Sequence, residues 1–147
     1  MYHYALTLPA GWAAAPAAAP WDGSGAPTHG EPVVDSFVGP ASPASWAFGA
    51  PTKETLSVYV ASVVSDNFKF HGCTCPAKPE SVEPIEIGGE PGALIAWNCG
   101  ILINLAATVH GGIGYHFGFR DPAVHAATDP TDRAVFSTLL SSVTFGS

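Results

Sequence analysis

Apolar and polar residues alternate along several stretches of the chain, the pattern of β-strands with one face against a core. Near the N-terminus, residues 2–8 alternate in this way and predict a first strand. Two further short strands are predicted over 33–38 and 45–48, because turn-forming Gly39 and Pro40 separate two β-prone runs. These patterns indicate a meander in the first third of the chain.

The second half of the chain carries four more strand patterns. They cover residues 82–87, 92–99, 101–110 and 114–120. Placing the apolar odd-numbered residues on one face pairs Val109 with Tyr115 and leaves a three-residue loop over 111–113. The same rule pairs Ile85 with Ile95. We therefore expect the odd-numbered face of the sheet to be apolar throughout.

Two segments change to the 3.6-residue period of an amphipathic helix. The first follows Thr52, an N-cap residue, and its apolar stripe contains Leu56, Tyr59, Val60, Val63, Val64 and Phe68. The second follows Asp129 and Pro130, and its stripe contains Val135, Phe136, Leu139, Leu140 and Val143. The pattern predicts an α+β fold in a single domain over residues 1–147, with a curved antiparallel sheet of about six or seven strands covered by two main helices.

Residues 13–32 are rich in alanine, proline and glycine and have no periodic pattern, which predicts a long surface loop. The loop contains Trp21, Asp22 and His29. Long ordered loops often carry functional residues, so these three side chains are candidates for ligand binding.

Composition limits the partners of the chain. Of its 147 residues, 47% are hydrophobic and 12% are charged, which indicates a well-filled core. The net charge of -7 comes from 12 acidic and 5 basic residues, and no segment clusters lysine or arginine. Nucleic acid and anionic membranes are therefore disfavoured as partners, and a cationic or neutral ligand fits better. No apolar run reaches the roughly 20 residues of a spanning helix, so we expect no membrane insertion by this domain.

Three cysteines indicate an oxidising compartment. Either Cys73 or Cys75 could bridge to Cys99 and close a loop of about 25 residues, worth roughly 3 kcal/mol. The alternative is a zinc site formed by His71 with the three cysteines, although the spacing lacks the Cys-x₂₋₄-Cys pair of structural zinc sites. A disulfide is the favoured interpretation, and the role of the third cysteine stays open. The chain begins abruptly in a strand pattern, which suggests the hypothesis that a signal or lipid anchor precedes Met1.

Two short motifs carry a family resemblance. The first is Leu8-Pro9-Ala10-Gly11-Trp12, and the second is Phe136-x-x-Leu139-Leu140-x-Ser142-Val143-x-Phe145. With the central helix and the meander, the chain resembles the PsbP-like superfamily. That superfamily includes an extrinsic photosystem subunit, a nuclear-import factor that binds a small GTPase, and many bacterial lipoproteins and secreted proteins.

The resemblance implies an α-β-α sandwich around an antiparallel sheet. The chain looks most similar to secreted or lipid-anchored actinobacterial forms, which implies an extracytoplasmic location and a Cys75–Cys99 disulfide. The family offers no catalytic residue to carry over.

The face of the sheet opposite the apolar one is predicted to be polar. It would display Asn98, Asn104, Thr108, His110, His116 and Arg120. Under the expected register, Thr108 lies opposite His116 and Asn104 lies opposite Arg120. This surface could face a ligand, together with the 13–32 loop. The alternative is ordinary solvent exposure of one face of an antiparallel sheet.

We interpret the chain as a non-catalytic extracytoplasmic binding or protein-interaction module, whose ligand-binding residues are Asn104, Thr108, His116, Arg120, Trp21, Asp22 and His29. Its partner would be a protein or a small molecule, and we predict no cofactor and no metal site. The alternative is a small hydrolase or metal-assisted enzyme that uses His116 with Asn104 or Arg120, or Asp22 with His29. Convergence of these groups in one pocket would favour the enzyme.

Overall fold

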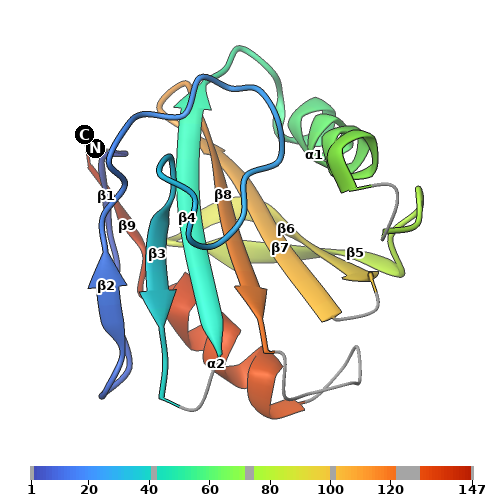
Figure 1. The fold of residues 1–147 in the computed structure, drawn as a ribbon. Helices are drawn as coiled ribbons and strands as arrows, with labels where there is room; N and C mark the ends of the chain where they lie inside the picture. The colour runs from blue at the N-terminus through green and yellow to red at the C-terminus, as the bar shows by residue number, and fades with distance from the viewer. Residues whose placement is uncertain (1, 41–42, 72–74, 100–101, 122–129, 147) are drawn as a thin grey trace.

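The protein is described here by a computed structural model, which covers residues 2–40, 43–71, 75–99, 102–121 and 130–146. Within these residues, a seven-stranded antiparallel sheet has one helix on each face (Figure 1). In order across the sheet, the strands are β2 (Ala13–Ala15), β3 (Asp35–Val38), β4 (Ala44–Pro51), β8 (Ile113–Arg120), β7 (Leu102–His110), β6 (Glu90–Asn98) and β5 (Ser81–Ile87). The helices are α1 (Leu56–His71) and α2 (Pro130–Ser141). The predicted α+β class, strand number and pair of helices are confirmed.

The two chain ends meet in a small second sheet. Strand β1 (Tyr4–Ala5) pairs with β9 (Thr144–Phe145), and both termini lie on the same side of the molecule (Figure 1). The strand predicted over 2–8 is therefore much shorter than expected. Tyr2 is buried, and its hydroxyl accepts a hydrogen bond from the Trp21 amide at 2.9 Å and donates one to the Val33 carbonyl. The N-terminal segment is therefore fixed by side-chain contacts as well as by the short β1–β9 pairing.

The segment predicted as a loop over 13–32 contains an edge strand, β2, which pairs with β3. The loop prediction is wrong for these residues because three alanines carry no alternating pattern. The rest of the segment runs across the sheet and is held by side chains. The carboxylate of Asp35 accepts hydrogen bonds from the Ala17 amide at 2.8 Å and from the Tyr4 hydroxyl at 2.7 Å.

Helix α1 begins later than predicted. The Thr55 carbonyl accepts the first helical hydrogen bond, from the Tyr59 amide at 2.9 Å, so Thr55 occupies the N-cap position. The Thr52 hydroxyl instead accepts a bond from the Glu54 amide within the preceding turn. For α2, Pro130 is the first helical residue, as expected, while the predicted cap Asp129 lies outside the described residues.

The predicted strand registers are wrong at β5–β6, where Ile85 lies opposite Gly92 instead of Ile95, and wrong by one residue at β7–β8. Val109 lies opposite Gly114, and Thr108 lies opposite Tyr115. Two-residue Gly-Gly turns close the β5–β6 and β7–β8 hairpins, at Gly88-Gly89 and Gly111-Gly112, with φ between 56° and 83° at all four glycines. Positive φ at both positions is what a type I′ turn requires, and this turn matches the twist of paired strands.

The corrected registers divide the apolar residues between two faces of the sheet. Ile103, Leu105 and Ala107 of β7 lie on the same face as the even-numbered residues of β8, and α1 packs there; we call it the α1 face. Tyr115, Phe117 and Phe119 project to the other side, the α2 face, where Phe119 stacks on Phe136 with ring centroids 5.4 Å apart. The expectation of one apolar face is wrong because helices cover both faces, so both are buried.

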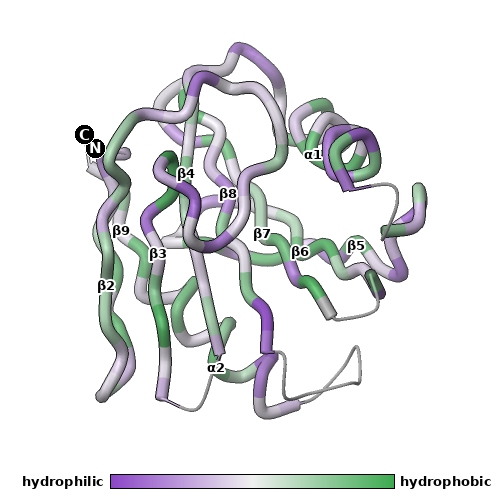
Figure 2. Tube along the Cα trace, viewed as in Figure 1, coloured by the Kyte–Doolittle hydropathy of each residue, from purple (hydrophilic) through white to green (hydrophobic). Residues whose placement is uncertain are grey.

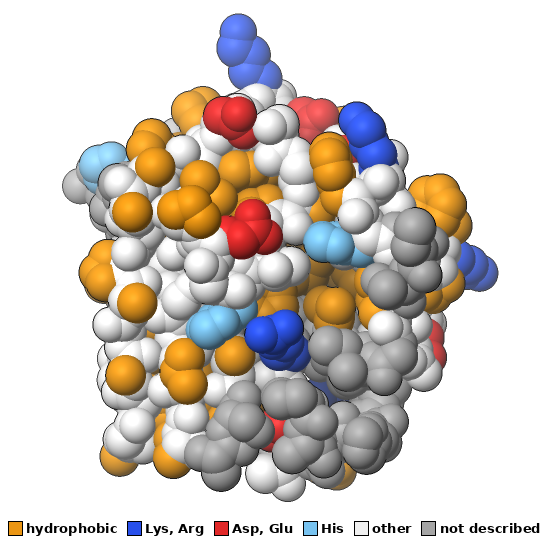
Figure 3. Space-filling view, in the orientation of Figure 1, with side chains coloured by type: hydrophobic (Ala, Val, Ile, Leu, Met, Phe, Trp, Pro, Cys, Tyr) orange, Lys and Arg blue, Asp and Glu red, His pale blue; other side chains and the backbone are white. Residues whose placement is uncertain are grey.

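Hydrophobic positions run along the inner strands, with hydrophilic positions on β8 among them (Figure 2). Neither helix of the described part of the chain is long and apolar enough to cross a membrane. The lysine and arginine side chains that Figure 3 shows stand apart from one another and form no basic patch on that face.

Candidate functional site

Strand β8 contributes two glycines and one histidine to the α1 face. A Cβ atom at Gly114 would lie 2.3 Å from the ring of Tyr59, and one at Gly118 would lie 2.0 Å from the ring of Trp46. The glycines therefore leave space for two aromatic rings that come from α1 and β4. His116 lies between these two rings along the strand.

Aromatic rings surround His116 on three sides. Phe48 stacks on the imidazole with centroids 4.5 Å apart, and Trp21 and Tyr59 each make a T-shaped contact with it at a centroid distance of 5.3 Å. His116 is 6% exposed, and its burial lowers the pKa of the imidazole to about 3. The site therefore holds a neutral, polar ring within an aromatic wall at ordinary pH.

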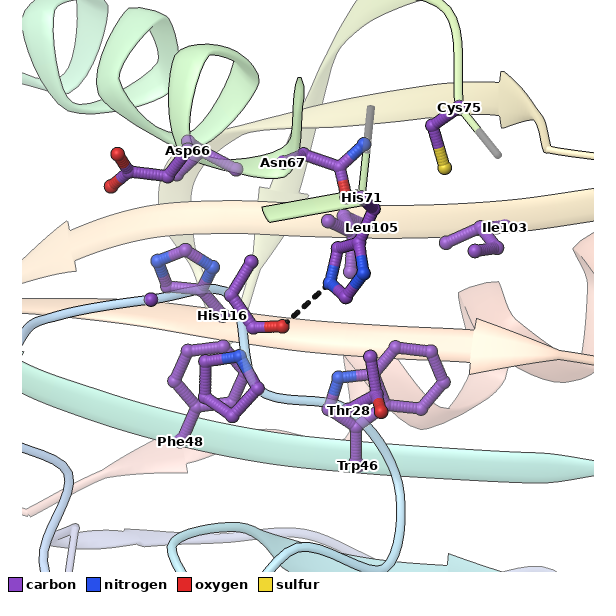
Figure 4. Close-up of a pocket in the computed structure, with 14 residues that line it drawn as sticks. Thr28, Trp46, Phe48, Asp66, Asn67, His71, Cys75, Ile103, Leu105 and His116 are labelled. Carbon is purple, nitrogen blue, oxygen red and sulfur yellow. Dashed lines mark hydrogen bonds between the residues drawn. The ribbon is translucent and has the colours of Figure 1, made fainter. Parts of the chain in front are cut away.

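A first cavity, of about 70 Å³, lies between the C-terminal half of α1, the sheet and residues 25–28 (Figure 4). His71 closes one side, because its Nε2 atom lies 2.8 Å from the Ala26 carbonyl oxygen. Trp46 and Asn67 line the cavity, and their buried Nε1 and Nδ2 atoms have no hydrogen-bond partner among the described residues. Buried polar atoms are usually paired, so these two donors are available to a bound group or a water molecule.

Two further hollows adjoin this cavity. One, of about 260 Å³, lies between Trp21, Tyr59 and the first half of α1, and the other, of about 430 Å³, lies on the far side of Trp21 beside Phe70. His116 lines the first cavity and the 260 Å³ hollow, and Trp21 lines both hollows. The acidic residues that line the three spaces are Asp22, Glu31, Glu54 and Asp66. Lysine and arginine are absent from all three linings within the described chain.

The predicted binding residues do not form one surface. His116 and Trp21 lie together on the α1 face, and Asp22 lines the outer hollow, where hydrogen bonds from Ser24 hold the pKa of its carboxyl below the ordinary value. His29 lies apart, near Arg120; burial and then the charge of Arg120 lower the pKa of its imidazole.

Asn104 and Thr108 lie on the α2 face, opposite Phe119 and Tyr115. Both are buried, and the Thr108 hydroxyl donates to the Pro91 carbonyl at 2.7 Å. The expected pairs of Thr108 with His116 and of Asn104 with Arg120 are therefore wrong. The prediction of a solvated polar face fails because the one-residue register change separates the four side chains between two buried faces.

The enzyme alternative that combines His116 with Asn104 is disfavoured, because these two side chains project to opposite sides of the sheet.

Sequence reasoning missed Tyr59, Glu54 and Asp66 as site residues. Asn67, a buried amide within the apolar stripe of α1, was the one available signal.

The disulfide joins Cys75, which follows α1, to Cys99 at the end of β6, with an S–S distance of 2.05 Å. Cys75 also lines the first cavity. The bond removes two thiolates from the alternative zinc site, and Cys73 lies outside the described residues. The described chain contains no group of three or more metal-binding side chains.

The arrangement of strands and helices defines a PsbP-like α+β fold. It is similar to the solution structure of cyanobacterial PsbP (CyanoP) from Synechocystis sp. PCC 6803, with a TM-score of 0.64 over 97% of this chain and 86% of that chain. The two sequences are 13% identical, so the similarity concerns the fold. No protein-family model matches the chain, and no curated protein matches it in sequence.

Proposed function

We propose that the protein is a non-catalytic, extracytoplasmic binding module whose ligand site is the group of hollows around His116. The observation that carries this proposal is a neutral, buried imidazole inside an aromatic wall, with the unpaired donors of Trp46 and Asn67 beside it. Small-molecule sites combine apolar walls with a few convergent polar groups in this way.

The location is supported by the Cys75–Cys99 disulfide, because such bonds persist in oxidising compartments and are rare in the cytosol. The partner is a small molecule or one side chain of a protein. The volumes of the hollows, 70 and 260 Å³ for the two that His116 lines, fit a group of that size.

A thermal-shift screen with small metabolites and cell-envelope fragments tests the proposal. A ligand present at ten times its Kd stabilises the native state by about 1.4 kcal/mol and raises Tm. Val63 lines both spaces beside His116, so Val63→Phe should fill them and abolish the shift. Val58 is 50% exposed on the same helix, so Val58→Phe is the matched control and should keep the shift.

Circular dichroism of both variants checks that they fold. A ligand that shifts Tm equally in Val63→Phe and Val58→Phe binds elsewhere and contradicts the proposed site. A screen in which no compound raises Tm counts against a binding function.

A further inference from the structure

The 260 Å³ hollow has walls of fixed aromatic rings. The Trp21 indole N–H donates to the Ser24 carbonyl at 2.6 Å, which holds the ring in place, and Tyr59 is buried against Gly114. Both rings also meet His116. The negative face of an aromatic ring attracts cations, most strongly where the site is desolvated.

Two carboxylates lie at this hollow. Glu54 and Asp66 both line it, and neither forms an ion pair with a basic side chain of the described residues. Glu54 is positioned by the Ser62 hydroxyl, which donates to it at 3.2 Å. Figure 4 shows the Asp66 side chain extending away from His71. Burial, and then the charges of Glu54 and Asp66, raise the pKa of Tyr59 well above its ordinary value. The negative charges of the two carboxylates are therefore felt at the Tyr59 hydroxyl.

The hollow also contains buried groups that have no partner. Tyr59 is only 7% exposed, and its buried hydroxyl forms no hydrogen bond. The His116 ring, 6% exposed, makes no hydrogen bond to the described residues. A phenol oxygen and one nitrogen of a neutral imidazole can each accept a hydrogen bond. The site therefore offers four acceptors, counting one for each of these two groups and one for each carboxylate.

We propose that this hollow binds a primary ammonium group carried on a small apolar body. The inference rests on the proposed function and names the ligand class of the same site. The carboxylates and the aromatic lining favour a positive charge, and the four acceptors favour one that has N–H donors over a quaternary ammonium. The apolar body would lie against Trp21 and Val63. The excess of acidic over basic residues, 12 to 5, also favours a cation.

Isothermal titration calorimetry at pH 7 with three probes that share one benzyl group tests the inference. Benzylamine carries the ammonium, benzyl alcohol is its neutral counterpart, and benzyltrimethylammonium keeps the charge without N–H donors. We expect benzylamine to bind at least about tenfold more tightly than either of the others. Its affinity should fall as salt is raised, because partly exposed charges are screened.

Two conservative variants assign the effect to the carboxylates. Glu54→Gln and Asp66→Asn should each lower benzylamine affinity about fivefold and leave benzyl alcohol unchanged. Glu80→Gln removes the same charge from an exposed position that lines none of the hollows, so it should bind benzylamine like the parent. An equal loss in Glu80→Gln would overturn the inference, because net charge alone would then explain binding.

The remaining outcomes distinguish a failure of the ammonium assignment from a failure of the proposed binding function. Equal binding of benzylamine and benzyl alcohol, abolished in both by Val63→Phe, would overturn the ammonium assignment and support the site. Equal binding of benzyltrimethylammonium would overturn the requirement for N–H donors. Absence of binding by all three probes would overturn the inference, whereas the proposed function would stand or fall with the thermal-shift screen.

Discussion

The two sides of β8 are built in opposite ways. On the α2 face the strand supplies its own bulk, since Tyr115, Phe117 and Phe119 all project there. They pack against rings from the chain ends and α2, among them Tyr4, whose ring centroid lies 5.5 Å from that of Phe117. On the α1 face the strand supplies two glycines, His116 and, at its end, Arg120, and other elements supply the aromatic rings.

The contrast shows how one strand can serve both stability and binding. Bulky residues on alternate positions of the strand fill their side directly. Glycines on the other positions let Tyr59 and Trp46 approach the backbone of the strand on either side of His116. The hollows that His116 lines lie on the side where packing depends on several distant elements.

The largest effect is expected on the α2 face. Phe117 is 3% exposed, so Phe117→Ala should lower the free energy of unfolding by about 3 to 5 kcal/mol, as truncation of a buried aromatic ring does. Urea denaturation followed by fluorescence measures it. A loss below about 1 kcal/mol would mean that this side is not the tightly packed one.

A somewhat smaller effect is expected where a cross-link fastens α1 to the sheet. Cys75 and Cys99 are 24 residues apart, so the double variant Cys75→Ser/Cys99→Ser should lose about 3 kcal/mol through the greater entropy of the unfolded chain. Guanidinium unfolding with and without reductant measures this, and reduced wild type should match the variant. Peptide mapping that finds both thiols free after aerobic purification would contradict the bond itself.

On the α1 face, adding a single methyl group should be harmful. A Cβ at position 118 would lie 2.0 Å from Trp46, so Gly118→Ala should destabilise the fold by about 1 to 3 kcal/mol through overpacking. Thermal unfolding measures the change. Adding Trp46→Phe should restore part of the loss, and strict additivity of the two substitutions would show that the ring does not need the glycine.

The smallest expected effect is a pH dependence of the free energy of unfolding that His116 causes. Its pKa of about 3 in the folded state lies below the value of about 6.5 in an unfolded chain, so the unfolded state binds the proton more readily between these values. This contribution to stability is complete above pH 6.5 and falls as the pH drops towards 3. Between pH 7 and pH 5 it amounts to about 2 kcal/mol.

His116→Gln should remove this part of the change in the free energy of unfolding with pH. The pKa of His29 is also lowered, so His29 makes both proteins lose stability as the pH falls. The difference between parent and variant therefore isolates the contribution of His116. Denaturation midpoints at several pH values measure it. Parallel curves for the two proteins would show that the imidazole is not desolvated.

The sequence was sufficient for the helices and the long strands of the fold, but it missed the short strands β2 and β9 and did not determine the strand registers. Alternation located the four strands of the second half, and the stripes of α1 and α2 located both helices. The period-two pattern could not choose a face for β7, because Leu105 and Ala106 are both buried, on opposite sides. The paired glycines at 111 and 112 carried the correct register, since they fit a two-residue turn.

The candidate site was predictable in part. His116 and Trp21 were identified as binding residues, although as members of a solvated polar surface. Their meeting with Tyr59, Glu54 and Asp66 depends on where the segment around Trp21 crosses the sheet and on which residue of β8 faces α1. No local sequence pattern determines the path of the segment around Trp21 or the face of β8 that meets α1, because both depend on contacts between residues far apart in the chain.

The order of the strands leaves the large sheet open at β5 and β2, and both margins resist extension by another molecule. Pro84 in the middle of β5 has no amide hydrogen to offer an incoming strand, and Glu86 on the same strand adds a negative charge. At the other margin, β2 is only three residues long. Polymerisation through backbone pairing is therefore disfavoured, and molecules that bind this protein are expected to engage its side chains.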